Sequence, residues 1–310
     1  MINDNGTQIQ LLSPSVLSEY PKDARFIDTM RKGLFKEIGW HYWVDLTWIL
    51  AKLRELNIPK GATVLDAGAG YGLLQFALAF AGYQVISVDF SNRKARFPHK
   101  MIFSFDELRN KSDFNHIYIE QVKGYNQLRY HPKRLLTFFR NNWEDFFFFA
   151  NLMWKCKFGG NVPGRITLYH ADIKNMQEIQ NSSVDAVVSC SVIEHLQLND
   201  VPVVLNEFCR VLKPTKPMII TTSASKGPDW FHEPSLGWCY SRRTLSTIFE
   251  QTAEQDTEFE NFDTIQTQYQ ESKILRNLLP SSYFVSGNNG MPWGDWNPVY
   301  VPVGIIKRNP

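Results

Sequence analysis

Cysteine is scarce in this sequence, and its spacing matches no common metal-binding or disulfide motif. The four cysteines lie far apart, without a C-x-x-C pair or a cluster with histidine. This spacing argues against a zinc site and against a disulfide framework. We therefore predict reduced, buried or half-buried thiols at Cys156, Cys190, Cys209 and Cys239.

Targeting signals, long apolar runs and a strong charge imbalance are also missing. The first eight residues do not combine a basic start with an apolar stretch, and no apolar run approaches the ~20 residues of a membrane span. The net charge of +2 neither indicates nor excludes a polyanionic partner. We therefore expect a cytoplasmic protein without a transmembrane segment. Nothing in the sequence indicates an oligomeric state.

The most informative segment is a glycine-rich turn that follows an apolar run. Residues 63–72 read TVLDAGAGYG, so the acidic residue at 66 is followed by glycines at 68, 70 and 72. Glycine adopts backbone angles that other residues avoid and lets the main chain approach a ligand closely. Because residues 73–79 then resume a helical pattern, the segment predicts a strand that ends in a ligand-binding loop.

Four further apolar runs follow, and two of them end in a carboxylate. Residues 83–89 end at Asp89, seventeen positions after Gly72, and residues 166–172 end at Asp172. Residues 184–191 and 218–222 complete the series. An acid at the end of the second strand of such a unit is suited to binding ribose hydroxyls. The spacing therefore predicts a nucleoside ligand.

As a set, these motifs resemble the class I S-adenosylmethionine-dependent methyltransferases, in particular the type 11, ubiquinone-biosynthesis-like group of small-molecule enzymes. The resemblance covers roughly residues 40–90 and 165–250. It implies an α/β fold with a Rossmann-like, seven-stranded, mostly parallel sheet and helices on both faces, and S-adenosyl-L-methionine as the cofactor. The positions that match the family's cofactor-binding motifs are Asp66, Gly68, Ala69, Gly70, Gly72, Asp89, Phe90, Ala171, Asp172, Ile173, Ser189 and Cys190.

A nicotinamide dinucleotide site is the rival interpretation of the glycine loop. Such sites use G-x-G-x-x-G, in which the third glycine packs helix against strand and leaves room for a pyrophosphate. This chain has Leu73 at that position. Since S-adenosylmethionine carries no phosphate, the leucine favours the methyltransferase interpretation.

The connection between the second and third strands is far longer than one helix requires. Residues 92–165 contain fourteen Lys or Arg against six Asp or Glu, and sixteen of the forty-three aromatic residues. We predict one methyltransferase domain over residues 1–310, with an N-terminal lid or extension at 1–42. The segment 92–165 is predicted to be an inserted helical, aromatic-rich, basic cap.

Two features of this insertion leave alternatives open. Apolar residues between 139 and 153 recur at helical spacing on a wide face. That face either packs between insertion and core, lines a pocket for a bulky substrate, or meets a partner or a membrane surface through residues 139–154. The basic excess fits an acidic substrate group or a nucleic acid, but a solvated basic surface is favoured. The solvated surface is favoured because several of the basic residues stand in loop-like or helix-start segments: Arg93, Lys94, Arg96, Lys133 and Arg134.

Several segments flank the predicted cofactor site. Residues 39–43 concentrate three aromatics and a histidine, typical of either a lid or a helix start, and residues 43–56 carry a helical stripe. Near the end, residues 261–268 and 299–307 are predicted strands around a helix at 271–279. The loop at 226–240 follows the fifth strand, where ligands bind in such sheets, although a packed surface loop would look the same. Its candidate substrate contacts are Trp230, His232, Glu233, Trp238 and Tyr240.

The catalytic candidates are histidines. His195, next to Glu194 just beyond the fourth strand, is the first candidate for a general base, and His232 is the second. Some ubiquinone-pathway relatives bind a metal with an acid where this chain has Ser191, so we predict no metal. Residues 189–192 match neither the amino-methylating nor the cytosine-methylating motif, which argues against nucleic acid.

The sequence therefore predicts an S-adenosylmethionine-dependent methyltransferase that acts on an O or N atom of a small-molecule metabolite, one that is acidic, bulky or sugar-containing. The first alternative is a cofactor-binding Rossmann-like protein with a regulatory or assembly role. The second, less favoured alternative is an RNA methyltransferase.

Overall fold

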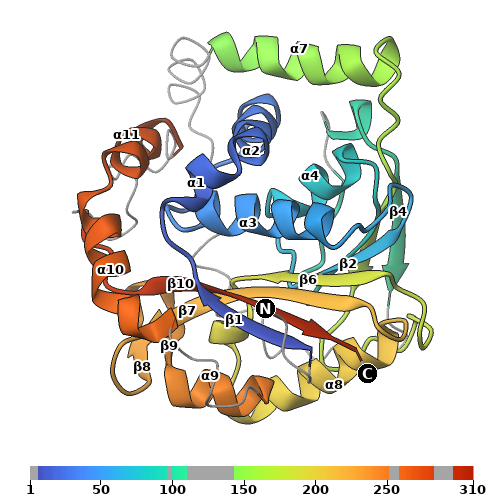
Figure 1. The fold of residues 1–310 in the computed structure, drawn as a ribbon. Helices are drawn as coiled ribbons and strands as arrows, with labels where there is room; N and C mark the ends of the chain where they lie inside the picture. Colours follow the sequence, from blue (N-terminus) through green and yellow to red (C-terminus); the bar gives the residue numbers. More distant parts are fainter. Residues whose placement is uncertain (1–5, 96–98, 110–142, 251–257, 283–295, 310) are drawn as a thin grey trace.

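A ten-stranded, mostly parallel sheet organises the chain (Figure 1). The computed structural model describes residues 6–95, 99–109, 143–250, 258–282 and 296–309. Eight strands follow each other across the sheet, and a hairpin, β8 and β9, joins the carboxyl end of β7. In spatial order the strands are β1 (Thr7–Leu11), β10 (Val301–Arg308), β7 (Pro217–Ser225), β6 (Ala186–Cys190), β2 (Thr63–Ala67), β3 (Gln84–Asp89), β5 (Ile166–His170) and β4 (Phe105–Arg109), with β8 (Trp230–His232) and β9 (Gly237–Ser241) off this path.

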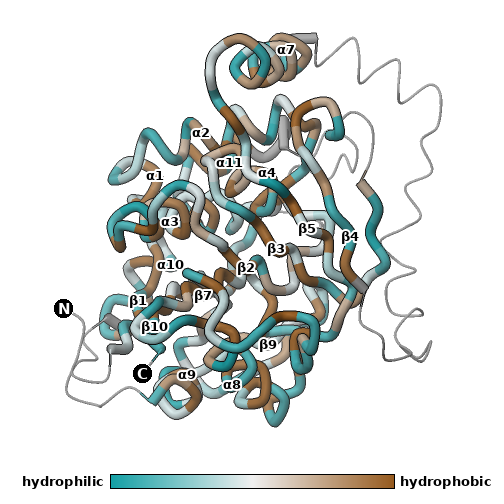
Figure 2. The backbone as a smooth tube through the Cα atoms, turned by 90° about the vertical axis from the view of Figure 1, so that its right-hand side faces the viewer, coloured by the Kyte–Doolittle hydropathy of each residue, from teal (hydrophilic) through white to brown (hydrophobic). Residues whose placement is uncertain are grey.

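The five apolar runs predicted from the sequence form the parallel centre of the sheet: β2, β3, β5, β6 and β7. All nine residues of β7 are buried, as expected for a strand that is covered on both faces. Figure 2 shows hydrophobic stretches along β2, β3 and β5. The predicted Rossmann-like fold class is confirmed, but the strand count is larger than seven.

The extra strands come from segments without a strong strand pattern. β1 pairs antiparallel with β10, and β4, which lies within the predicted insertion, pairs parallel with β5. The predicted strand at 261–268 is wrong, because this segment is the helix α10 (Phe262–Glu271). Its buried residues recur at intervals of three and four, which is the helical period. They are Phe262, Ile265 and Tyr269.

Helices cover both faces of the sheet. In Figure 1, α2, α3 and α4 lie on one side of the sheet and α8 and α9 lie on the other. The helix predicted at 43–56 is confirmed as α3. The helices are α1 (Val16–Glu19), α2 (Pro21–Gly33), α3 (Tyr42–Glu55), α4 (Leu74–Phe80), α7 (Trp143–Lys157), α8 (Val201–Val211), α9 (Arg242–Phe249), α10 and α11 (Lys273–Ser282), and short turns include η1 (His99–Met101), η4 (Ile193–His195) and η6 (Glu233–Ser235).

The aromatic helix of the predicted insertion, α7, packs on α2. Leu152 is fully buried and lies where a Cβ on Gly33 would meet it at 2.5 Å. The ring of Phe35 lies 5.1 Å from Phe146 and 6.1 Å from Phe149. One side of α7 therefore packs on the core, but Phe146, Phe147 and Trp154 are 37%, 64% and 63% exposed, so the described helix does not bury the whole wide apolar face that the sequence predicted. The residues 110–142 lie outside the described part of the chain.

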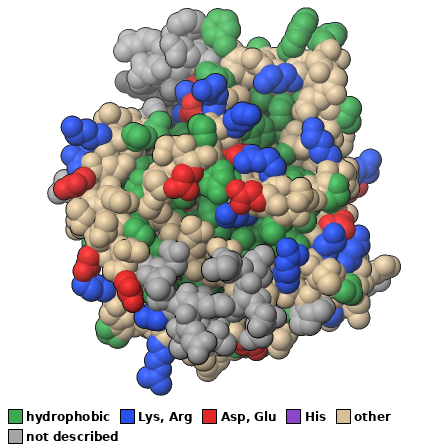
Figure 3. All heavy atoms as spheres, in the orientation of Figure 1, with side chains coloured by type: hydrophobic (Ala, Val, Ile, Leu, Met, Phe, Trp, Pro, Cys, Tyr) green, Lys and Arg blue, Asp and Glu red, His purple; other side chains and the backbone are tan. Residues whose placement is uncertain are grey.

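The surface of the described residues shows no single basic patch on the face drawn in Figure 3, where Lys and Arg side chains are scattered. Within the described ranges, no helix is both long enough and apolar enough to cross a membrane.

Candidate active site

The loop between β2 and α4 runs close to the segment after β6. Gly68 and Gly70 have φ angles of 72° and 49°, in the left-handed region that favours glycine. A Cβ on Gly68 would lie 2.5 Å from a methyl carbon of Val192. The loop closes on itself, because the Gly72 N–H donates to the Ala69 carbonyl at 2.9 Å. Glycine at position 68 therefore permits both the turn and the close packing.

Asp89, at the end of β3, is tied to this loop. Its Oδ2 accepts a hydrogen bond from the Gly70 N–H at 2.8 Å, and its Oδ1 accepts from the N–H and the hydroxyl of Ser91 at 2.8 and 2.5 Å. A carboxylate has about four lone-pair sites, so about one remains, on Oδ2. The residue is only 6% exposed. The loop and the acid thus form one preorganised unit with an acceptor left over.

Arg93 supports the loop from the side of β3. Its Nη1 donates to the Gly70 carbonyl at 2.9 Å and to the Ser87 hydroxyl at 2.7 Å, and its Nη2 donates to the Ser87 carbonyl at 2.5 Å. Burial lowers the pKa of the guanidinium, while the carboxylates of Asp89 and Asp66 oppose that shift. The favoured sequence interpretation, a solvated basic surface, is wrong for Arg93, which is 6% exposed.

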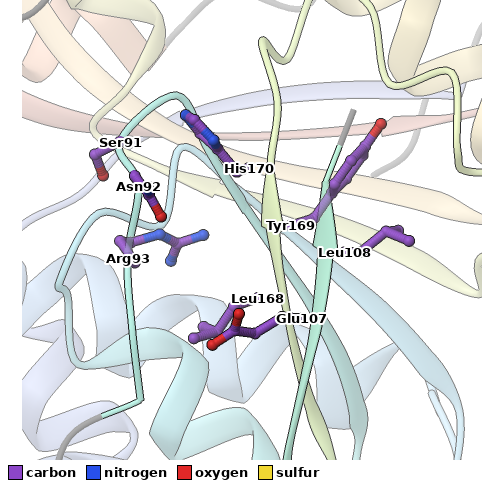
Figure 4. A pocket seen from close by; sticks show the side chains of 8 residues that line it. All are labelled: Ser91, Asn92, Arg93, Glu107, Leu108, Leu168, Tyr169 and His170. Carbon is purple, nitrogen blue, oxygen red and sulfur yellow. The ribbon is translucent and has the colours of Figure 1, made fainter. Parts of the chain in front are cut away.

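Figure 4 shows the Arg93 side chain reaching from the segment after β3 toward the strands that carry His170 and Glu107. These residues line a shallow pocket beside the guanidinium. The full lining is Ser91, Asn92, Arg93, Glu107, Leu108, Leu168, Tyr169 and His170.

Gln75 is a second support that the sequence reasoning missed. It is the one polar side chain in α4, and it is 3% exposed. Its amide donates to the carbonyls of Gly72 and Gly70 at 3.1 and 3.3 Å and accepts from the Ser87 hydroxyl at 3.0 Å. A single polar residue inside an apolar helix was the available signal, because such a group is buried only with hydrogen-bond partners.

Asp66 places a second carboxylate at the base of the loop. It is 2% exposed, and its Oδ2 has no hydrogen-bond partner among the described residues. Burial raises the pKa of Asp66 to about 7, with Arg93 opposing the shift and Asp89 adding to it. An orphaned buried carboxylate oxygen fits a cationic ligand group, because an unpaired buried polar atom is costly.

The ends of β3 and β5 lie side by side on the other flank of the loop. The Ala171 N–H donates to the Asp89 carbonyl at 3.1 Å, and His170 Nε2 lies 2.7 Å from the Phe90 carbonyl. The Phe90 side chain is 48% exposed. Asp172 accepts from the Lys174 N–H at 2.9 Å, and Ile173 is 7% exposed. The sheet therefore brings together the two acidic strand ends that the sequence predicted.

The end of β6 contributes buried polar groups next to β2. Ser189 is fully buried, and its hydroxyl has no partner within the described ranges. Burial raises the pKa of the Cys190 thiol well above its usual value. Cys190 is therefore a protonated thiol rather than a nucleophile. The buried Glu194 accepts from the Thr222 hydroxyl at 2.9 Å, and burial raises the pKa of this carboxyl.

Both histidines proposed from the sequence have defined contacts. His195 Nδ1 lies 2.8 Å from the Leu236 carbonyl, and this side chain is exposed. His232 Nδ1 lies 2.7 Å from the Ser235 hydroxyl, and burial lowers the pKa of this imidazole.

The β8–β9 hairpin carries the candidate substrate residues. Tyr240 is buried and donates to the Ile193 carbonyl at 2.9 Å, so it fixes η4 to the hairpin. Trp238 is 36% exposed and stacks edge-on against Phe231. Trp230 lies edge-on to His232 at 5.4 Å, while Glu233 is exposed in η6.

One polar cluster was not predicted from the sequence. His41, just before α3, has Nδ1 2.8 Å from Oδ2 of Asp45, and the Ser191 hydroxyl donates to the same oxygen at 3.2 Å. Burial raises the pKa of Asp45, and the hydrogen bonds from His41 and Ser191 oppose the shift. Residues 39–43 thus begin a helix, one of the two interpretations left open. A His and an Asp four residues apart at a helix start was the signal.

No group of three or more His, Cys, Asp or Glu side chains in the described part of the chain is arranged to hold a metal ion.

Comparison with known proteins gives a family match over part of the chain. Residues 150–220 match the model of the methyltransferase domain. No curated protein matches the chain.

Three solved structures match the chain at low similarity. A 1,6-didemethyltoxoflavin-N1-methyltransferase from Burkholderia thailandensis has 12% identity and a TM-score of 0.43, over 94% of this chain and 89% of that one. A putative sarcosine dimethylglycine methyltransferase from Galdieria sulphuraria has 15% identity and a TM-score of 0.41, over 84% of each chain. A geranyl diphosphate C-methyltransferase from Streptomyces coelicolor has 11% identity and a TM-score of 0.38, over 86% and 77%.

Proposed function

We propose that this chain, whose sheet is Rossmann-like, is an S-adenosylmethionine-dependent methyltransferase that methylates an O or N atom of a small-molecule metabolite. The observation that carries the proposal is the locked glycine loop. Its backbone is fixed by Asp89, Arg93 and Gln75, while Asp89 and Asp66 keep carboxylate lone pairs for a ligand.

The residues present fit the cofactor. In the proposed arrangement, the loop and Asp66 hold the methionine end, Asp89 binds the ribose hydroxyls, and Phe90 with residues 171–173 flanks the adenine. When bound, S-adenosylmethionine supplies an activated methyl group, so the protein needs to align the acceptor and exclude water. Alignment of this kind lowers a barrier by roughly 7–11 kcal/mol.

The acceptor side is proposed to lie over the ends of β6 and β7, between η4 and the β8–β9 hairpin. His195 and His232 stand there as the base candidates, with Trp230, Glu233, Trp238 and Tyr240 as substrate contacts. We also propose that residues 92–165 cap this side. Two contacts link the described helix α7 to the cofactor loop: Phe35 touches α7, and the neighbouring Lys36 donates to the Tyr71 carbonyl of the glycine loop at 2.7 Å. In Figure 1, α7 lies beyond α2, away from the β8–β9 hairpin, so these contacts support a cap near the glycine loop only.

A label-transfer experiment tests the proposal. The protein is incubated with methyl-labelled S-adenosylmethionine and with cell extract fractionated by size and charge. We expect one small-molecule fraction to take up label at an O or N atom, and RNA fractions to take up none. A protein that binds S-adenosylhomocysteine but labels no fraction would favour the regulatory alternative, and labelled RNA would contradict the small-molecule acceptor.

The raised pKa of Asp66 predicts that cofactor binding is linked to a proton. The free protein keeps Asp66 protonated up to about pH 7. The positively charged ammonium of S-adenosylhomocysteine favours the ionised carboxylate, so binding should release a proton below that pH. Affinity should therefore rise about tenfold between about pH 6 and about pH 8.

Calorimetry in two buffers of different ionisation enthalpy measures this release directly. Asp66→Asn should bind without releasing the proton, whereas Asp106→Asn, which changes an exposed carboxylate on β4, should behave as the wild type. Equal binding enthalpies in both buffers for the wild-type protein would contradict the role of Asp66.

A further inference from the structure

The His41–Asp45 pair has the geometry of a histidine held by a buried carboxylate. Asp45 Oδ2 lies 2.8 Å from His41 Nδ1, and the Asp45 side chain is 1% exposed. The His41 side chain is 14% exposed, and its Nδ1 faces the carboxylate. An imidazole bonded in this way through Nδ1–H presents the lone pair of Nε2 away from the carboxylate.

The pair lies at the carboxyl edge of the sheet, at the end of β6, which is the neighbour of the strand β2 that leads into the glycine loop. Ser191, whose hydroxyl bonds Asp45, directly follows β6. The thiol of Cys190, the residue before Ser191, interacts electrostatically with both Asp45 and Asp66. Ser191 holds a φ of 52°, a costly angle for a non-glycine residue, while its hydroxyl donates to Asp45 in α3.

Aromatic rings connect this pair to the proposed acceptor side. The Tyr42 ring lies 4.2 Å from the His41 ring, and Tyr300 lies 6.0 Å from it. Tyr300 in turn lies 5.5 Å from His232 on the β8–β9 hairpin. The buried Glu194 interacts electrostatically with His195 and, further down in magnitude, with His41. His41 therefore borders the same space as the hairpin and η4.

We propose that His41 is the general base of this methyltransferase, that Asp45 positions it, and that the acceptor atom is a hydroxyl oxygen. This inference rests on the proposed function and assigns the acceptor class within it. As the new O–CH₃ bond forms and the S–CH₃ bond breaks, the hydroxyl proton passes to Nε2 of His41. The electron pair of the broken bond stays on sulfur, and the imidazolium then releases its proton to solvent.

The hydrogen-bond partner of Nδ1 differs between the three candidate histidines, His41, His195 and His232. The partner of His195 Nδ1 is the neutral carbonyl of Leu236, and that of His232 is a serine hydroxyl. The Nδ1 of His41 instead lies 2.8 Å from the carboxylate of Asp45, which stabilises the imidazolium that forms as the proton arrives, although Glu194 also interacts electrostatically with His195. A hydroxyl needs such a base because it must lose its proton during transfer.

The first test needs no methyl acceptor. In protein with ¹⁵N-labelled histidine, NMR should show His41 as the Nδ1–H tautomer, and Asp45→Asn should abolish that preference. An Nε2–H tautomer of His41 in the wild-type protein would mean that Asp45 is protonated and donates to Nδ1, which overturns the proposal. Calorimetry with S-adenosylhomocysteine on the same sample tests the proposed methyltransferase function separately. A protein that does not bind S-adenosylhomocysteine contradicts that function but leaves the tautomer of His41 as a separate result.

The second test measures turnover with the extract fraction that takes up label. His41→Ala should lower kcat by about 10²–10⁴-fold, with the affinity for S-adenosylhomocysteine unchanged. Added imidazole should restore part of the rate, which a merely structural role would not allow. His41→Asn keeps a hydrogen-bond donor toward Asp45, so this variant should fold even if His41→Ala does not. Its kcat should fall by the same factor as that of His41→Ala. Glu250→Gln changes a 74% exposed carboxylate that pairs with Lys307 and should leave kcat unchanged.

The positioning role of Asp45 gives a third comparison. Asp45→Asn should lower kcat more than it raises KM, and Asp45→Glu should recover part of the lost rate. The proposal is overturned if His195→Ala shows the large, imidazole-rescued loss while His41→Ala does not, or if the labelled atom is nitrogen.

Discussion

Replacing Asp89 by alanine should weaken binding of S-adenosylhomocysteine by at least about 100-fold. Hydrogen bonds to a charged group contribute about 1.5–3 kcal/mol each, and a 100-fold change corresponds to about 2.7 kcal/mol. The substitution removes the proposed acceptor for the ribose hydroxyls. It also frees the Gly70 N–H and the Ser91 hydroxyl, which Asp89 holds at 2.8 and 2.5 Å.

Titration calorimetry with S-adenosylhomocysteine measures the Asp89 effect, and circular dichroism checks that the variant is folded. Asp106→Ala is the matched control, since that carboxylate is 48% exposed and pairs with Arg165 at the edge strand β4. The control should bind as the wild type does. A folded Asp89→Ala variant with unchanged affinity, or a wild-type protein that binds NAD instead, would refute the proposed cofactor site.

Replacing Arg93 by glutamine should lower the free energy of unfolding by about 3–5 kcal/mol, the usual cost of removing one partner from a buried charge network. The substitution leaves the carboxylates of Asp66 and Asp89 without their buried cation. It also leaves the Ser87 carbonyl without the guanidinium donor that lies 2.5 Å away. The glycine loop should then lose its fixed position, and cofactor affinity should fall as well.

Urea unfolding of the free protein measures the Arg93 effect. The control is Arg165→Gln, because Arg165 is 58% exposed and its pair with Asp106 is worth little in water. We expect almost no change in the free energy of unfolding for the control. If both arginine variants lose the same stability, the network around Arg93 does not hold the loop as described.

Much of the fold followed from local patterns in the chain. The apolar runs gave the five central strands because parallel strands covered on both faces need nearly continuous apolar sequence. The helix at 43–56 followed from its apolar stripe. The segment 261–268 was assigned wrongly because a short apolar pattern fits either period, and burial of Phe262, Ile265 and Tyr269 on one face decided for helix.

Some residues of the candidate site were predicted from local sequence patterns, and others became visible only in the structure. The glycine loop and Asp89 were found from sequence, since the turn requires glycine and the acid follows at a fixed spacing. The supports were missed because each looks ordinary in its own segment. Arg93 stands in a basic stretch, and Gln75 stands in a helix, and only the fold brings both to the carbonyl of Gly70.

By itself, therefore, the sequence determined the class of fold, the glycine loop with its following acid, and the family to which its motifs point, because backbone angles and apolar periodicity are local properties. The tertiary structure alone decided which charges are buried and which side chains meet. His41 and Ser191 are 150 positions apart in the chain, yet both form a hydrogen bond with the carboxylate of Asp45. Contacts of that kind depend on how α3 packs against the end of β6, and no local pattern encodes that packing.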